Sequence, residues 1–370
     1  MTDATPSPDA LPLAGLRVVE FTHMVMGPTC GMVLADLGAE VIKVEPPTGD
    51  NTRHLLGVGI GFFPVFNRNK KSVVLDLQTP QGREAALRLI ATADVVSENF
   101  KPGTMQKLGL DYDTLKALNP RLIYVSHKGF LPGPYEHRTA LDEVVQMMGG
   151  LAYMTGRPGD PLRAGSSVND IMGGMFGAIG VMAALRRRET TGRGGEVHSG
   201  LFENNILLVA QHMMQFAMSC QPARPMPERI SPWGIYDVFT VREGEQIFLA
   251  VVTETQWRAF CEAFGFADLL ADERLASNNL RVQARDWLIP ALRQRLADRP
   301  ARELAAITLP DGARAGQQAD TVLLPIAIDG QRAGVRLSPP RLGEHSAEVL
   351  GALGYSAAEI AQLSATATRG

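Results

Sequence analysis

Residues 16–45 read LRVVEFTHMVMGPTCGMVLADLGAEVIKVE, a stretch in which two β-rich runs flank a helical one. The same alternation continues as far as residue 130. Strands and helices that alternate at this spacing form a parallel sheet with helices on its faces, so we expect a Rossmann-like α/β domain. The expected strands are Leu16–Phe21, Val41–Glu45, Ser72–Leu77, Asp94–Asn99 and Leu122–His127, and the expected helices are Gly31–Leu37, Pro80–Ala91 and Tyr112–Leu118.

The loops after these strands are the expected ligand-binding region, because open parallel sheets bind ligands beyond the carboxyl ends of their strands. A dinucleotide site is not supported, since no GxGxxG motif follows the first strand. The loops are Thr22–Pro28, Pro46–Arg53, Asn99–Gly103 and Lys128–Gly133.

The rest of the chain predicts longer helices and a second unit. Apolar helices are expected at Asp142–Gly150, Ile171–Arg188 and Leu201–Met218, the last two separated by a turn rich in Gly and Arg. A smaller α/β unit follows, built from a hairpin at Gly234–Val241 and Gln246–Val252 and helices near Thr255–Phe264 and Trp287–Leu296. We therefore expect a large domain at 11–220, a small domain at 221–330, and a return to the large domain at 331–370.

Composition narrows the class of protein. The chain has 370 residues, of which 45% are hydrophobic and 20% charged, and we read no long apolar run in it, so we expect a soluble globular protein that spans no membrane. A net charge of −3 argues against nonspecific binding of nucleic acid. Cys30, Cys220 and Cys261 match no zinc or CxxC spacing, so we expect reduced thiols and no metal site. The first ten residues lack the features of a signal peptide, which favours the cytoplasm.

Asp170 is the candidate catalytic residue. It stands just before a glycine-spaced apolar run, in the sequence SSVNDIMGGMFG of residues 166–177. A carboxylate at a helix start gains from unpaired N–H groups and from the helix dipole, and glycine lets backbone or ligand approach closely. The simpler interpretation is that Asp170 or Asn169 is only a helix N-cap. The window alone leaves both open.

Several ordered sequence blocks together resemble the family III coenzyme A transferases, which include formyl-CoA transferase, carnitine CoA-transferase and the α-methylacyl-CoA racemases. The resemblance extends over nearly the whole chain. The blocks are LAGLRVVEF at 13–21, GP at 27–28, DLGAEVIKVE at 36–45, NRNKKS at 67–72, ENFKPG at 98–103, TGRGG at 191–195 and LGEH at 342–345.

The resemblance implies a fold, a partner and a reaction. The fold implied is a large Rossmann-like domain with a smaller α/β domain, in a homodimer whose subunits interlock as rings. The activity implied is a CoA transferase of the EC 2.8.3 type, which moves coenzyme A from an acyl-CoA to a free carboxylic acid without a prosthetic group. Asp170 matches the nucleophile, which forms a mixed anhydride and then an aspartyl-CoA thioester. We expect N–H donors at the glycine-rich helix start to stabilise the oxyanions.

The resemblance also implies contacts with coenzyme A. Lysine supplies positive charge for phosphates, and phenylalanine offers an apolar face. Without the resemblance, Lys101 and Lys107, like Lys70 and Lys71, read as solvated surface, but as a cluster beside a strand's carboxyl end they favour phosphate binding. The implied CoA-binding residues are Leu75, Asp76, Leu77, Gln78, Asn99, Phe100, Lys101 and Lys107.

The chain departs from two branches of this family. The racemases place a catalytic His directly before the Asp that matches Asp142, and here that position is Leu141, whose aliphatic side chain is neither acid nor base. A racemase is therefore the less favoured alternative. Formyl-CoA:oxalate transferases carry Gln, Lys and Tyr at the positions of Val25, Thr139 and Leu141, which makes oxalate an unexpected acceptor. A CoA-binding Arg of that branch is replaced by Pro46.

A further departure lies near Ile307, where a stretch of the small domain that family members usually carry is missing. The small domain usually forms one wall of the active-site cleft. The shortening therefore leaves a noncatalytic acyl-CoA-binding protein as an alternative to the transferase. The sequence specifies neither the acyl donor nor the acceptor acid.

Overall fold

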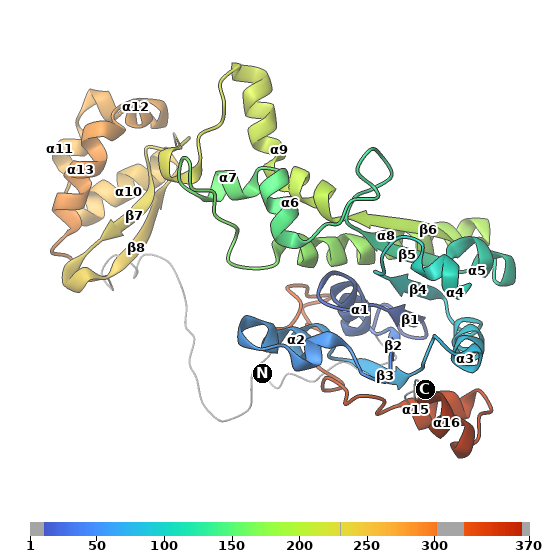
Figure 1. Cartoon of the computed structure of the whole chain (residues 1–370). Coiled ribbons are helices and arrows are strands. Elements are labelled where there is room, and N and C mark those ends of the chain that lie inside the picture. The colour runs from blue at the N-terminus through green and yellow to red at the C-terminus, as the bar shows by residue number, and fades with distance from the viewer. Residues whose placement is uncertain (1–10, 230, 302–321, 365–370) are drawn as a thin grey trace. The chain divides into compact units, whose positions relative to one another are not determined.

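The computed structural model describes residues 11–229, 231–301 and 322–364. Its larger unit is built on a parallel sheet of six strands in the order β3-β2-β1-β4-β5-β6 (Figure 1). The order reverses between β1 and β4, which is where such sheets bind ligands. The strands are β1 (Arg17–Phe21), β2 (Glu40–Glu45), β3 (Lys70–Val74), β4 (Val95–Glu98), β5 (Ile123–Lys128) and β6 (Gly195–Gly200).

The first five strands confirm the sequence prediction to within about three residues at each end. Their core is predictable because strands covered on both faces read as nearly continuous Val and Ile. The sixth strand contradicts the prediction, which treated β6 as part of a turn. Glu196 and His198 project towards solvent from this edge strand and glycine stands at both ends, so it lacks an apolar run.

Helices cover both faces of the sheet, and successive strand residues point to opposite faces. Val18 packs with α1 and α8 on one face, and Val19 packs with α3, α5 and the C-terminal helices on the other. The helices around the sheet are α1 (Met26–Asp36), α2 (Phe62–Phe66), α3 (Pro80–Ile90), α4 (Thr104–Leu108), α5 (Tyr112–Leu118), α8 (Val168–Thr191), α15 (Ser346–Ala352) and α16 (Ala357–Ser364), with short 3₁₀ turns at Asn51–His54 and Gly57–Gly61.

Helix α8 packs closely against α1 through two glycines. A Cβ atom at Gly174 would lie 2.4 Å from the carbonyl oxygen of Met26, and one at Gly173 would lie 2.4 Å from the Met26 Cε atom. Glycine is therefore required at position 174, where the clash is with backbone, whereas at position 173 the flexible end of the Met26 side chain would have to move. The neighbouring helices of this layer are α6 (Asp142–Met148), α7 (Leu151–Thr155) and α9 (Leu201–Ser219).

Helix α8 is also long and apolar enough to cross a membrane by length and composition alone. The expectation that the chain contains no long apolar run is therefore wrong for this segment. The core helix of a soluble protein meets the same criterion, and α8 packs on α1, β5 and β6.

The edge strand β3 is covered by the C-terminal part of the chain. The N–H of Asn69 donates to the carbonyl of Leu337 at 2.9 Å, and the N–H of His345 donates to the carbonyl of Ser72 at 3.0 Å. The Ser346 hydroxyl accepts the N–H of Val74 at 3.1 Å. These bonds occupy an edge that would otherwise offer unpaired groups to another chain.

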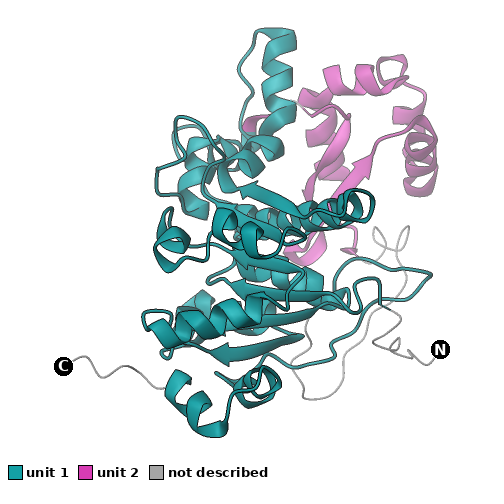
Figure 2. Ribbon diagram, turned by 90° about the vertical axis from the view of Figure 1, so that its right-hand side faces the viewer, with its two compact units in different colours: residues 1–227, 320–370 teal, residues 228–319 magenta. Residues whose placement is uncertain are grey.

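The second compact unit comprises residues 228–319, and residues 1–227 and 320–370 form the first (Figure 2). Within the second unit, β7 (Ile235–Thr240) and β8 (Gln246–Val251) pair antiparallel, as the hairpin pattern predicts. Buried aromatic and aliphatic side chains join the hairpin to its helices. Those helices are α10 (Glu254–Phe264), α11 (Ala267–Leu270), α12 (Asn278–Gln283) and α13 (Arg285–Leu296), with 3₁₀ turns at Arg242–Gly244 and Glu273–Leu275. A further 3₁₀ turn, Met226–Glu228, spans the sequence boundary between the two units. The shortening expected near Ile307 lies outside the described residues.

Candidate active site

A cleft of about 480 Å³ opens at the carboxyl ends of β1 to β4. Its place is the one the strand order predicts for a ligand. Five of the implied CoA-binding residues line it, namely Leu75, Asp76, Leu77, Gln78 and Phe100. The other lining residues are Thr22, His23, Val44, Glu45, Pro46, Thr48, Gly49, Asp50, Asn51, Thr104 and Leu108.

The other three implied residues are placed differently. The Asn99 side chain accepts the N–H of His23 at 2.9 Å and donates to the His23 carbonyl at 2.7 Å, so it fixes the loop after β1. Lys101 lines a neighbouring cavity, and Lys107, exposed in the last turn of α4, lines neither of the two. The geometry thus brings five of the eight together, and the CoA contacts of all eight stay predictions.

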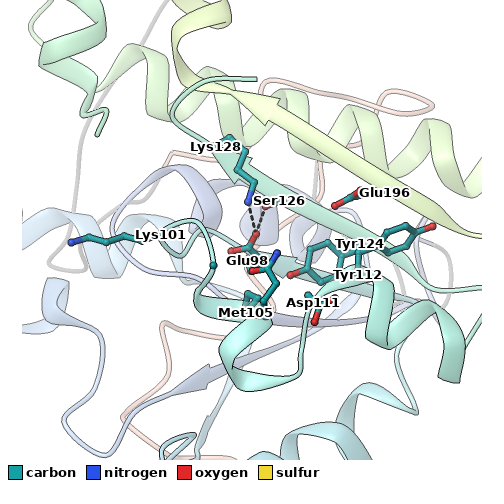
Figure 3. A pocket seen from close by; sticks show the side chains of 11 residues that line it. Glu98, Lys101, Met105, Asp111, Tyr112, Tyr124, Ser126, Lys128 and Glu196 are labelled. Atoms are coloured by element: carbon teal, nitrogen blue, oxygen red, sulfur yellow. Dashed lines mark hydrogen bonds and ion pairs between the residues drawn. The ribbon is translucent and has the colours of Figure 1, made fainter. Parts of the chain in front are cut away.

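The neighbouring cavity is small and polar. Its volume is about 40 Å³, room for a few water molecules at most and far too small for a nucleotide. At its centre Glu98 accepts from the Lys128 ammonium at 3.3 Å and from the Ser126 hydroxyl (Figure 3). Lys101 points away from this carboxylate in the same view. Lys101 is therefore left available to a ligand outside the cavity.

Buried ion pairs lie beneath the cleft. The Lys43 ammonium is 3.0 Å from the Asp50 carboxylate, and the Lys70 ammonium is 2.7 Å from the Glu20 carboxylate. Burial lowers the pKa of Lys70 to about 8, against the opposing charge of Glu20. Lys70 is thus neither solvated surface nor a phosphate ligand, and both sequence interpretations of it are wrong. Lys71 pairs with Glu40 and Glu348 and also lies outside the cleft.

Asp170 is the third residue of α8, and its carboxylate accepts no hydrogen bond from the part of the chain that the structure describes. The pKa of Asp170 is raised to about 7, chiefly by burial and also by the negative charges of Asp142 and Glu143, while the positive charge of Arg163 opposes this rise. The N-cap position belongs to Ser167, which makes no side-chain capping bond. The interpretation of Asp170 or Asn169 as a cap is therefore wrong.

The helix start is instead capped by a residue from another helix. Asp142 is buried, and its Oδ1 atom accepts the N–H of Asn169 at 2.8 Å and that of Asp170 at 3.3 Å. Those two N–H groups are therefore not free to stabilise an oxyanion, contrary to expectation. Asp142 does not cap its own helix, where the N-cap residue is Leu141. No sequence spacing signals a cap supplied from 27 residues away.

The segment that follows β1 contributes to the cleft and also contacts the first turns of α8. Thr22 and His23 line the cleft, and α1 begins three residues later at Met26. The first turn of α1 packs on Gly173 and Gly174, one turn after Asp170.

Comparison with known proteins identifies the family. The sequence model of CoA-transferase family III matches residues 13–320. This chain belongs to CoA-transferase family III.

Several CoA-transferases of this family are similar to it. The acetyl-CoA:oxalate CoA-transferase of Acetobacter aceti is 36% identical, over 81% of this chain and 79% of its own length. The succinate–glutarate CoA-transferase of Agrobacterium fabrum is 34% identical over 92% of this chain and 96% of its own length. A crystal structure of a CAIB/BAIF family protein from Brucella suis superposes with a TM-score of 0.79 at 34% identity, covering 93% of this chain and 99% of that one. The chain is thus a CoA-transferase, which moves coenzyme A between acids.

The match to the Agrobacterium family III enzyme extends over 390 positions, more than the 370 residues of this chain. That enzyme therefore contains residues with no counterpart in this chain.

Other titratable groups in this CoA-transferase have structural roles. His127 is buried, its Nε2 atom lies 3.2 Å from the Ser97 hydroxyl, and burial lowers its pKa to about 3. Burial raises the pKa of Cys30, which makes this thiol unreactive.

Leu141 is 59% exposed at the start of α6, where the racemases carry their His. Within residues 11–229, 231–301 and 322–364, no cluster of His, Cys, Asp and Glu is arranged to hold a metal ion.

Proposed function

We propose that this CoA-transferase uses Asp170 as a covalent nucleophile to move coenzyme A from an acyl-CoA to a free carboxylic acid. The observation that carries the proposal is the setting of the carboxylate, which is half-buried beside two other carboxylates and accepts no hydrogen bond among the described residues. A carboxylate that accepts no hydrogen bond from the protein is a more reactive nucleophile than one held by several donors. With a pKa of about 7, a large fraction is ionised at neutral pH.

The proposed reaction has four steps and needs no external reductant or oxidant. An Asp170 oxygen bonds to the acyl carbonyl carbon, the C–S bond breaks, and CoA leaves as a thiolate. The thiolate then attacks the aspartyl carbonyl of the anhydride, releasing the donor acid and forming an aspartyl-CoA thioester. The acceptor carboxylate attacks this thioester and expels the thiolate again. Attack of the thiolate on the acceptor's carbonyl gives the new acyl-CoA and restores the Asp170 carboxylate.

Coenzyme A would lie in the cleft at the carboxyl ends of β1 to β4. The cleft residues Leu77 and Phe100 offer apolar surface for an adenine ring. None of the lining residues is Lys or Arg, so the phosphates require cations from its rim. Lys101 and Lys107 are the exposed candidates from the loop after β4 and from α4.

The acid acceptor is proposed to be a small carboxylic acid, with dicarboxylates first in order of testing. The names of the two CoA-transferases compared above include succinate, glutarate and oxalate. Oxalate belongs in the panel because of the Acetobacter relative, although Val25, Thr139 and Leu141 argue against it. Acetyl-CoA and succinyl-CoA are the matching donors.

The homodimer is a second part of this proposal. A monomer would leave an unusually large apolar surface exposed on α6, α7, α8 and α9. A second copy of the chain that covers this surface would bury it, as an interlocked pair requires. The exposed side chains are Val144, Met147, Met148, Tyr153, Met175, Phe176, Ile179, Leu207, Leu208, Met213, Met214, Phe216 and Met218. Sedimentation equilibrium gives the mass directly, and a monomer at micromolar concentration would contradict this part.

The central test is covalent trapping. The protein is incubated with acetyl-CoA or succinyl-CoA without acceptor, quenched with hydroxylamine, and analysed by peptide mass spectrometry. A hydroxamate at Asp170 is the expected result. A protein that binds CoA tightly but forms no adduct would be the noncatalytic acyl-CoA-binding protein instead. Exchange of the acyl α-proton for deuterium without acceptor would point to the racemase.

A further inference from the structure

We propose that Asp142 is a positioning residue for the transfer reaction, which with Gln146 fixes the start of α8 and leaves the Asp170 carboxylate free to attack the acyl group. The inference rests on the proposed role of Asp170 as nucleophile. It concerns a residue on a different helix, which reaches Asp170 only through the backbone and through charge.

The first part of the argument is the use of the N–H groups at the helix start. A helix leaves its first N–H groups without partners, and an acidic side chain at the third position ordinarily turns back to accept one of them. Here Asp142 Oδ1 already accepts the N–H groups of Asn169 and Asp170. Both atoms of the Asn169 side-chain amide are buried without a partner, so this neighbour supplies no cap either. The Asp170 carboxylate is thus not drawn into capping.

The second part is the support of Asp142 itself. Gln146, one turn further along α6 and fully buried, donates from Nε2 to the Asp142 carboxylate. Its Oε1 atom accepts the N–H of Ala164 at 2.8 Å, in the loop that leads into α8. The pair therefore holds both the loop and the helix start. A side chain locked in this way keeps a reacting group within the small tolerance that catalysis requires.

The third part is the charge around Asp170. From α6 it faces Asp142 and Glu143, and from the preceding loop it faces Arg163, which is itself paired with Glu143. Helix α1 contributes Met26, Thr29 and Cys30 against the glycines of α8, and none of them is charged at neutral pH.

Two titratable groups on other elements pack against the same helix layer. His127 on β5 meets α8 at Gly177 and is neutral, because burial lowers its pKa to about 3. Glu203 on α9 accepts the N–H of Leu131 at 3.1 Å, in the loop after β5. Among these groups, Asp142 is therefore the buried negative charge that is hydrogen-bonded directly to the helix start that carries Asp170.

That charge assists the first chemical step. As the Asp170 oxygen bonds to the acyl carbon and the C–S electron pair departs with CoA, negative charge moves from the carboxylate to the thiolate. The repulsion between Asp142 and Asp170 is relieved as this happens, so it raises the energy of the starting state more than that of the transition state. The step involves no proton and needs no added reagent.

The test is the pH dependence of adduct formation in a single turnover. Wild-type protein is mixed with acetyl-CoA or succinyl-CoA from pH 5 to 9, and the hydroxylamine-trapped Asp170 peptide is quantified. Asp142→Asn keeps an acceptor oxygen but removes the charge. Gln146→Met removes the support but not the charge. Glu143→Gln is the matched control, because it removes a neighbouring charge that makes no bond to α8.

In wild type the rate is expected to rise with pH around a midpoint near 7. Asp142→Asn is expected to move the midpoint to lower pH and to lower the plateau by about tenfold to a hundredfold. Gln146→Met is expected to lower the plateau and keep the midpoint, and Glu143→Gln to keep the plateau. Unchanged CoA binding shows that each variant is folded.

Two results would overturn the inference, and a third would overturn the proposed function. If Asp142→Asn forms the adduct with the same plateau rate and the same pH midpoint as the wild-type protein, a positioning role is excluded. If that variant does not fold, a wild-type plateau in Gln146→Met is the overturning result. Absence of any adduct in the wild-type protein at every pH would instead reject Asp170 as the nucleophile, and with it this inference.

Discussion

Two regions of the larger unit bury charged side chains, and the regions differ in whether those charges are paired with opposite ones. Under the cleft, Glu20, Lys43, Asp50 and Lys70 are almost fully buried, and each has an opposite charge within 4 Å. At the start of α8, Asp170 is half-buried beside two like charges, and its carboxylate accepts no hydrogen bond within the described chain. A paired buried charge holds structure together, whereas an unpaired one is costly and is characteristic of functional sites.

The largest effect is expected from removing the unpaired carboxylate. Asp170→Asn keeps the shape of the side chain but cannot form the anhydride, so CoA transfer should fall by about 10⁴-fold or more. Steady-state transfer between succinyl-CoA and a panel of carboxylic acids measures it. Transfer at the parental rate would remove the basis of the proposed mechanism.

The next largest effect comes from breaking a paired charge. Lys70→Met leaves Glu20 buried, with Lys43 at 3.9 Å as its remaining cation, and should lower the free energy of unfolding by about 3–5 kcal/mol. Urea denaturation at fixed protein concentration measures this loss. The control is Lys71→Met, whose partly exposed pairs contribute at most about 1 kcal/mol.

A double variant sharpens that result. Adding Glu20→Gln to Lys70→Met removes the uncompensated charge and should recover part of the lost stability. Equal losses in the single and double variants would show that packing of Lys70, rather than its charge, is what matters.

The unpaired carboxylate should also cost stability in a pH-dependent way. The pKa of Asp170 is raised from 3.8 to about 7, so between these values the folded protein holds a proton that the unfolded chain has lost. Stability therefore falls as the pH rises from 4 to 7. Asp170→Asn should be more stable than wild type by about 2–4 kcal/mol at pH 8 and equally stable at pH 4. Denaturation curves at both pH values test this, and a gain that does not vary with pH would contradict it.

The smallest effect is expected from replacing two exposed lysines, Lys101 and Lys107. Lys101→Ala and Lys107→Ala should each raise KM for acyl-CoA by about threefold to tenfold and leave kcat unchanged, because each phosphate contact contributes about 1 kcal/mol. Lys116→Ala on α5 is the control, since it lines neither cavity and pairs with Asp113. An equal change in all three would indicate a general effect of charge.

The sequence predicted much of the fold, for physical reasons that also explain the failures. Helix Tyr112–Leu118 was located to the residue, since Asp111 caps its start by accepting the N–H of Thr114. Helix α8 begins three residues earlier than predicted because its start is capped by Asp142, which local spacing does not reveal. Strand β6 lacked an apolar run and was missed.

The candidate site was predictable where its residues come directly after the end of a strand. Leu75 to Gln78 and Phe100 lie immediately after β3 and β4 and line the cleft as expected. The role of Lys70 was not predictable, because its burial depends on Glu20, which is 50 residues away in sequence. Long-range pairing of this kind leaves no pattern in a single sequence.

The cover over β3 has a consequence for synthesis on the ribosome. Asn69 and its partner Leu337 are separated by 268 residues, and the whole second unit is encoded between them. At about 5–20 residues per second, roughly a quarter of a minute to one minute passes between the emergence of the two. During that interval the nascent sheet has one open side, and a neighbouring nascent chain or a chaperone is able to reach it first.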